Sequence, residues 1–305
     1  MYPVLKSVVY MWSLLPLPLL YLQSRCLAFF AHRIIGYRKA VILDNLRHAF
    51  PDKDEAELKR IRRDFYRNFC DVIVEIIKLM SMSPDAIRAR IKLLNPETVD
   101  EMVAHGRGGI AVFSHFGNWE WMAAGLALQL PFPTYGVYKP LSNKAFDKLM
   151  LNIRQRMKNR MIAQQHTYRE ALKLLEQPCY IGFLGDQNPA PTGKMYFTPF
   201  MGRPVPAHLG IATIALRLGA PLYYFDHRRV SRGRYTIEIV RIPSEDLQPF
   251  SKKNVHRLTD RHVAFLEQVI HTDPAAWLWS HKRWKRSPKP GDALSEQIQT
   301  PTASP

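Results

Sequence analysis

The stretch Ile110–Tyr138, IAVFSHFGNWEWMAAGLALQLPFPTYGVY, decides the fold. It begins with a short apolar run, turns at Gly117 and Asn118, continues as a helical pattern and ends in a second strand-like run, Thr134–Tyr138. We expect Asn118 to cap the helix, because asparagine side chains accept bonds from free backbone N–H groups at helix starts. Strands joined through a helix are typical of parallel sheets with helices on their faces.

The same alternation continues along the chain. Further strand-like runs are CYIGFLG at 179–185, PLYYFD at 221–226 and YTIEIVRI at 235–242, and helical patterns cover 143–159 and 207–219. An earlier segment places Leu58, Ile61, Phe65, Phe69, Val72, Ile76 and Met80 on one helix face, with Asp52 or Asp54 as its cap. We therefore predict an α/β fold with a mixed, largely parallel sheet covered by helices.

The N-terminal segment predicts membrane attachment. Ser7–Leu22 carries no charge but contains Pro16 and Pro18, and it is slightly short for a spanning helix of ~20 residues. It either spans weakly or lies in the interface, and a cleaved signal peptide is the rival interpretation. We predict an uncleaved hydrophobic membrane-anchor helix in residues 1–30, one main domain in 31–288 and a disordered tail in 289–305.

Charge indicates the partners. The 305-residue chain has 43 Lys and Arg against 26 Asp and Glu, a net charge of +17, which favours a polyanion, an anionic membrane or acidic proteins. Basic residues after the apolar run outnumber those before it, which places the rest of the chain in the cytoplasm. The chain contains no recognised nucleic-acid module, so we predict no nucleic-acid partner, although a non-catalytic, membrane-tethered nucleic-acid-binding protein remains the alternative class.

His115 and Glu120 follow the first strand of the opening stretch. A carboxylate bonded to one imidazole nitrogen leaves the other free to take a proton from a hydroxyl, so His115 is a candidate general base and Glu120 its orienter. A histidine that only satisfies its own turn explains the pair equally well. His262 and Glu267 repeat the spacing inside a helical pattern, where the two side chains point apart.

Other chemistries lack their motifs. The sequence has no G-x-S-x-G, Walker loop or H-E-x-x-H, and the GRGG at 106–109 precedes a strand instead of following one. Its three cysteines are far apart, so neither a metal nor a disulfide framework is predicted. The remaining class of reaction is group transfer by acid/base chemistry, in which the hydroxyl of the acceptor is the nucleophile.

Several motifs together resemble the late lipid A acyltransferases, the lauroyl/myristoyl transferases of the glycerolipid acyltransferase superfamily. His115 and Glu120 are similar to that superfamily's H-x4-D/E motif. The resemblance runs from about Gly36 to Pro288 and implies that 31–288 is an acyltransferase domain. Its other motifs are GYR at 36–38, NLRHAFP at 45–51, YKPLSN at 138–143, GDQ at 185–187, PFMG at 199–202 and WSHKRWKRSP at 279–288.

The resemblance implies transfer of a fatty acyl chain from an acyl-carrier-protein thioester to a hydroxyl of a lipid A precursor. The implied partners are acyl carrier protein, the lipid A precursor and anionic lipids at the cytoplasmic face of a bacterial inner membrane, with no bound cofactor. His115 and Glu120 are the implied catalytic residues. The implied substrate-binding residues are Asn118, Lys139, Asn143, Asp186 and Gln187.

Lys139 departs from the family pattern, which usually has arginine at this position. A lysine keeps the charge but loses the planar fork that grips phosphate at two points. Lys282 likewise replaces an arginine of the usual H-R-R run. Other branches of the superfamily acylate aminolipids, mannosyl lipids or lysophospholipids, so the acceptor stays open.

Overall fold

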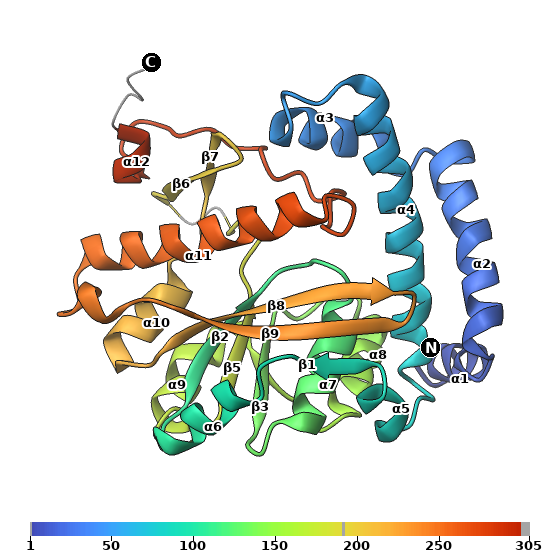
Figure 1. The fold of residues 1–305 in the computed structure, drawn as a ribbon, viewed down its shortest axis with the longest axis horizontal. Coiled ribbons are helices and arrows are strands. Elements are labelled where there is room, and N and C mark those ends of the chain that lie inside the picture. Colours follow the sequence, from blue (N-terminus) through green and yellow to red (C-terminus); the bar gives the residue numbers. More distant parts are fainter. Residues whose placement is uncertain (1, 191–192, 300–305) are drawn as a thin grey trace.

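The computed structural model describes residues 2–190 and 193–299. A seven-stranded sheet with the order β1-β9-β8-β2-β5-β3-β4 lies at its centre (Figure 1). Neighbouring strands run parallel except for the antiparallel β8–β9 hairpin. The strands are β1 (Ile91–Leu93), β2 (Gly109–Phe113), β3 (Thr134–Tyr138), β4 (Arg160–Ala163), β5 (Tyr180–Leu184), β8 (Leu222–Ser231) and β9 (Arg234–Ile242).

The predicted mixed, largely parallel α/β fold is confirmed. The opening stretch forms β2, helix α7 (Trp119–Gln129) and β3, and the Asn118 side chain caps α7 by accepting a bond from Trp121 N. Strand β8 is longer than the apolar run that predicted it. It continues to Ser231 because its hairpin with β9 adds backbone hydrogen bonds beyond the apolar residues.

Two apolar cores lie on opposite faces of the sheet. One joins α3, α4 and α9–α11 to the sheet, and the other joins α5–α8 to it. The remaining helix bounds are α3 (Lys39–Ala49), α4 (Glu55–Lys78), α5 (Pro84–Arg88), α6 (Glu97–Ala104), α8 (Lys144–Gln155), α9 (Thr167–Leu174), α10 (Gly210–Leu218) and α11 (Lys252–Thr272), with 3-10 turns at Gln164–His166 and Glu245–Leu247. The predicted apolar face of residues 58–80 faces inward on α4 and the turn after it, and Asp54 is the cap.

The N-terminal segment forms two helices instead of one. Helix α1 (Tyr2–Ser13) ends before Pro16, which cannot donate a helical hydrogen bond, and α2 (Leu17–Phe29) continues into a π-helix at Phe30–Ile34. The two parts are inclined by 110°. Within residues 2–190 and 193–299, no single helix has the length and apolar composition to cross a membrane, whereas this bent pair does by those criteria alone.

Helix α2 packs lengthwise against α4 (Figure 1). The Tyr21 hydroxyl donates to Glu75 at 2.7 Å, and the Ser24 hydroxyl donates to Asp71. Asp71 also pairs with Arg229 and Arg232 of the β8–β9 hairpin. Hydrogen bonds therefore join α2 to α4, and ion pairs join α4 to the β8–β9 hairpin.

The tail differs from its predicted disorder. Strand β10 (Ala293–Leu294) pairs with β6 (Tyr196–Phe200), which also pairs with β7 (Arg203–Pro206), and a short helix, α12, follows at Glu296–Gln299. Ser295 is fully buried and donates to Asp260 at 2.8 Å. A few specific hydrogen bonds hold this segment although its composition lacks an apolar period. Residues 300–305 of the predicted tail lie outside the described residues.

Candidate active site

His115 lies directly after β2, at the carboxyl edge of the sheet. Its loop, residues 114–118, is held by a C-terminal segment: Leu278 N donates to His115 O at 3.0 Å, and Gly117 N donates to Ala276 O at 2.9 Å. Gly117 has a φ of +53°, a left-handed conformation that favours glycine. The sequence therefore presents the histidine on a turn that is fixed by residues about 160 positions away.

Asp186 binds the histidine from the end of the neighbouring strand β5. Its Oδ1 lies 2.7 Å from His115 Nδ1, and its Oδ2 accepts bonds from His115 N at 2.9 Å and from Trp277 Nε1 at 2.8 Å. The carboxylate is 2% exposed. Burial alone raises the pKa of Asp186, but the charge of His115 and the hydrogen bonds from His115 and Trp277 outweigh it and hold the pKa at about 2.

An ionised Asp186 fixes the imidazole tautomer. A carboxylate only accepts hydrogen bonds, so Nδ1 of His115 carries the proton and Nε2 is left to accept one. The histidine side chain is 17% exposed, and the Trp119 ring packs edge-on to it at 4.9 Å. The arrangement suits a general base whose ring orientation is fixed by the bond between Nδ1 and Asp186.

Glu120 does not orient His115 in the structure, which corrects the sequence-based expectation. Its carboxylate is 5% exposed and forms a two-point ion pair with Arg154 of α8, through Nε at 3.0 Å and Nη2 at 2.6 Å. A guanidinium fork matches both carboxylate oxygens, while Asp186 already occupies Nδ1 of the histidine. Glu120 remains beside His115, because both side chains line the same cavity.

That cavity is the largest feature of the site. It has a volume of about 1120 Å³ and opens along the carboxyl edges of the central strands onto both faces of the sheet. Most of its lining is apolar, whereas His115, Glu120, Lys139, Arg154 and Gln187 contribute polar groups. A hollow of this size and composition is typical of a site for a ligand with a long apolar part.

The predicted substrate-binding residues fall into two groups. Lys139 and Gln187 line the cavity. Asn118 is fully buried, caps α7 and donates to Glu75 at 2.8 Å, and Asn143 caps α8 by accepting bonds from Ala145 N and Phe146 N. The structure thus gives the two asparagines helix-capping positions, and it places Asp186 behind His115.

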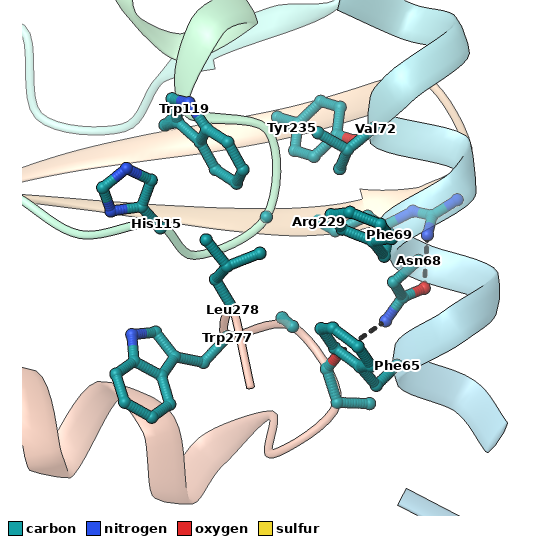
Figure 2. Close-up of a pocket in the computed structure, with 13 residues that line it drawn as sticks. Phe65, Asn68, Phe69, Val72, His115, Trp119, Arg229, Tyr235, Trp277 and Leu278 are labelled. Carbon is teal, nitrogen blue, oxygen red and sulfur yellow. Dashed lines mark hydrogen bonds between the residues drawn. The ribbon is translucent and has the colours of Figure 1, made fainter. Parts of the chain in front are cut away.

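A second, smaller crevice lies on the other side of His115 (Figure 2). Phe65, Phe69 and Val72 of α4 face His115, Trp119 and Leu278 across it, as Figure 2 shows. Asn68 links its walls, since it donates to Ala275 O at 3.2 Å and accepts a bond from Arg229. His115 therefore borders two hollows, and apolar side chains line much of both.

The remaining histidine and acid candidates are structural. His262 is buried and Glu267 accepts a bond from Met201 N at 2.7 Å, so the two do not form a pair. Burial lowers the pKa of His262 to about 4. In the part of the chain that the structure describes, no group of three His, Cys, Asp or Glu side chains is arranged to hold a metal ion.

Sequence reasoning missed Arg154 and Trp277. Arg154 belongs to a helix with several other basic residues, and nothing local distinguishes it. Trp277 falls just before the WSHKRWKRSP motif, so an interpretation of the whole C-terminal segment as part of the site would have included it.

Comparisons with known proteins extend over nearly all of the chain. The family model described as bacterial lipid A biosynthesis acyltransferase matches residues 5–286. A lipid A biosynthesis lauroyltransferase of Escherichia coli K12 is 24% identical over 286 residues, which are 93% of this chain and 90% of that protein. A lipid A biosynthesis palmitoleoyltransferase of the same organism and a lipid A biosynthesis acyltransferase of Shigella flexneri are each 20% identical over 283 residues, 92% of this chain and 90% of theirs.

Proposed function

The chain belongs to the bacterial lipid A biosynthesis acyltransferase family, and we propose that it transfers a fatty acyl chain from an acyl-carrier-protein thioester to a hydroxyl of a lipid A precursor. One observation carries the mechanism: Asp186 holds Nδ1 of His115, so Nε2 is free to act as a base beside a large, mostly apolar cavity.

In the proposed reaction, Nε2 of His115 takes the proton of the acceptor hydroxyl as its oxygen attacks the thioester carbonyl. The carbon–oxygen bond forms and the carbon–sulfur bond breaks. The imidazolium then gives its proton to the departing thiolate of the carrier. Ionised Asp186 stabilises the imidazolium between these two steps, as an acceptor-only partner should.

Positive charge is available for the oxyanion that forms at the carbonyl. Burial lowers the pKa of Arg154, but the charge of Glu120 and its hydrogen bonds outweigh it and raise the pKa, so Arg154 is a cation at neutral pH. Arg154 and Lys139 both line the cavity. We assign Glu120 the role of holding the Arg154 guanidinium in place. The positive charge of the guanidinium then stabilises the negative charge that develops on the carbonyl oxygen.

The proposal extends to the membrane and the carrier. The α1–α2 pair and the π-helix expose many large apolar side chains: Val4, Val8, Met11, Leu14, Leu19, Leu22, Phe29, Phe30, Ile34 and Ile35. We propose that this face lies on the cytoplasmic side of a bacterial inner membrane, anchoring a catalytic body that begins near residue 31. The net charge of +17 supports attraction to anionic lipids and to an acidic carrier protein.

The alternative acceptor is an aminolipid or a lysophospholipid. Lys139 is compatible with such an acceptor, because a lysine does not hold a phosphate in the fixed two-point geometry that an arginine imposes. The relatives' names differ in their acyl groups, lauroyl and palmitoleoyl, so family membership leaves the chain length open.

Mass spectrometry of lipid A tests the proposal. The gene is expressed in a Gram-negative strain that lacks its late acyltransferases, with His115→Ala as the matched control. We expect lipid A to gain the mass of one acyl chain with the wild-type protein only. A gain confined to another lipid class would select the alternative acceptor, and a gain with His115→Ala would overturn the mechanism.

A further inference from the structure

The face of the sheet that packs on α7 carries unusually small residues where the cavity enters it. Gly182 of β5 lies in register with Ala111 of β2 on one side and with Gly136 of β3 on the other. All three line the cavity. An added Cβ at Gly182 would come within 2.3 Å of the Phe113 ring, so only glycine fits there. The Phe113 ring lies over Gly182 and, together with Ala111 and Gly136, forms the sheet-side wall of an arm of the cavity that faces α7.

Helix α7 forms the other wall of the arm. Trp119, Glu120, Ala123 and Leu126 line the cavity at the three- and four-residue spacing of one helix face. Trp119 lies near His115, and Leu126 lies two turns further along the helix. The arm therefore extends from the catalytic histidine toward the amino ends of β3 and β5.

Polar residues close the deep end. Tyr180 and Thr134 begin their strands and lie in register, two positions from the Gly182–Gly136 pair and therefore on the same face of the sheet. The Thr134 hydroxyl donates to Asn159 Oδ1 at 2.7 Å, and all three residues line the cavity. Tyr180 is 2% exposed, and among the described residues its hydroxyl has no hydrogen-bond partner.

The Tyr180 ring is held firmly in this position. It packs edge-on against Phe132, Tyr223 and Phe225, with ring centroids 5.2, 5.8 and 4.8 Å away. Rings packed on several sides do not move aside without loss of contacts. The tyrosine is thus a fixed stop for anything that enters from His115.

We propose that Tyr180 determines acyl-chain length by ending the donor's binding pocket. This inference rests on the proposed acyl transfer. A terminal methyl group fits between the row of small residues and the Tyr180 ring. A longer chain must push against a fixed ring and against polar groups that gain nothing from hydrocarbon.

The depth of the arm sets the chain length. Four strand residues separate Phe113 from the level of Tyr180, about 13 Å, and seven helical residues separate Trp119 from Leu126, about 10 Å. An extended chain advances about 1.25 Å per carbon, from bonds of about 1.5 Å at tetrahedral angles. The arm therefore takes about 8–10 carbons, and with the first carbons held at His115 the preferred acyl chain has about 10–12.

Steady-state kinetics with acyl carrier protein that carries chains of different length tests this proposal. In Tyr180→Ala, kcat/KM for a chain four carbons longer than the wild-type optimum should rise at least about 10-fold relative to that optimum. Tyr180→Phe keeps the ring, so the same ratio should change less than about threefold. Thermal melting confirms that both variants fold.

Tyr168→Ala is the matched control. Tyr168 also lines the cavity, but it lies in the first turn of α9, on the opposite face of the sheet, and is 42% exposed. This variant should leave the length preference unchanged. If Tyr168→Ala shifted the chain-length preference and Tyr180→Ala did not, the donor chain would lie in the part of the cavity beside α9, and the proposal would be overturned.

Binding of free fatty acids separates this inference from the proposed function. Displacement of a fluorescent fatty acid from the purified protein should show the same optimum of about 10–12 carbons, and Tyr180→Ala should shift it to longer chains. Length-dependent binding without acyl transfer would sustain the pocket and refute the reaction. Acyl transfer with equal rates for all chain lengths would sustain the proposed reaction and refute the role of Tyr180 in chain-length selection.

Discussion

Two buried carboxylates flank the loop that carries His115, Asp186 at the end of β5 and Glu75 on α4. Each accepts three hydrogen bonds from different parts of the chain. Asp186 accepts from the His115 ring and backbone and from Trp277, whereas Glu75 accepts from Tyr21, Tyr235 and Asn118. Their exposed fractions, 2% and 0%, are almost equal, yet their electrostatic states differ.

The kind of donor explains the difference. Burial raises the pKa of both groups. At Asp186 the charge of His115 and the bonds from His115 and Trp277 reverse that effect, and the pKa falls to about 2. At Glu75 the three hydrogen-bond donors are neutral; they and the charge of Arg229 lower the pKa, but burial outweighs them and the pKa is raised. Hydrogen bonds satisfy both carboxylates, but only at Asp186 does the positive charge belong to a group that also donates hydrogen bonds to the carboxylate, and only there is burial outweighed.

The comparison separates a reactive site from a structural one. Asp186 acts on a histidine that borders two hollows, while Glu75 joins α2, α4, the α7 cap and β9 in a closed network. We expect substitutions around Asp186 to change turnover and those around Glu75 to change stability.

His115→Ala should have the largest effect. Loss of the base should lower kcat by about 10⁴-fold, the upper part of the range for general-base catalysis, without loss of folding because the side chain is partly exposed. The assay is acyl transfer from loaded carrier protein. His262→Ala, from the other His-x4-Glu pair, should retain activity at temperatures where it is folded. Equal activity in both variants would remove His115 from the mechanism.

Asp186→Asn should follow, with a fall of about 10²-fold in kcat and little change in KM. An amide oxygen still accepts the bond from Nδ1, but it cannot balance the charge of the imidazolium. Steady-state kinetics with donor and acceptor varied separately measures both constants. If the loss fell on KM instead, Asp186 would be a substrate contact and not the group that positions the base.

Glu120→Gln should cost less, about 10-fold in kcat/KM, because it weakens the two-point contact with Arg154 and leaves the His115–Asp186 pair intact. The decisive measurement is the order of the losses in kcat/KM between Glu120→Gln and Asp186→Asn. A larger loss in Glu120→Gln than in Asp186→Asn would restore Glu120 as the partner of the histidine. Arg154→Lys should resemble Glu120→Gln, since a lysine keeps the charge without the fork.

The chain's local patterns predicted the sheet and helices well, because short apolar runs that are buried as strands, such as β2 and β5, alternate with longer helical segments, such as α7 and α10. Both His115 and Asp186 follow strand-like runs in the sequence, and the structure shows that these two strands, β2 and β5, are neighbours. The partner of the histidine was predicted wrongly because Glu120 is near in sequence and Asp186 is 71 residues away. Which of two nearby carboxylates reaches Nδ1 depends on where Arg154 lies, and no local pattern contains that information.

The N-terminal break and the ordered tail escaped prediction for related reasons. A run of sixteen uncharged residues reads as one helix until Pro16 removes a backbone donor. The tail has too few apolar residues to predict packing, yet it adds a strand to β6 and buries Ser295. In both places a single residue or hydrogen bond overrides the average composition.

Glu75→Gln should have the smallest effect on catalysis, less than about threefold in kcat, because the residue has no direct contact with His115 or the cavity. Its signature is the pH dependence of stability. A carboxyl group whose folded pKa lies above its ordinary 4.5 stabilises the fold fully below pH 4.5, and that contribution is lost as pH rises through the folded value. Glutamine does not titrate. The difference in unfolding free energy between wild type and Glu75→Gln, from denaturant melts, should therefore move against the wild type as pH rises from 4.5 toward neutrality. A difference that moved in favour of the wild type over this interval would mean that Glu75 is ionised like Asp186, and the contrast between the two carboxylates would not hold.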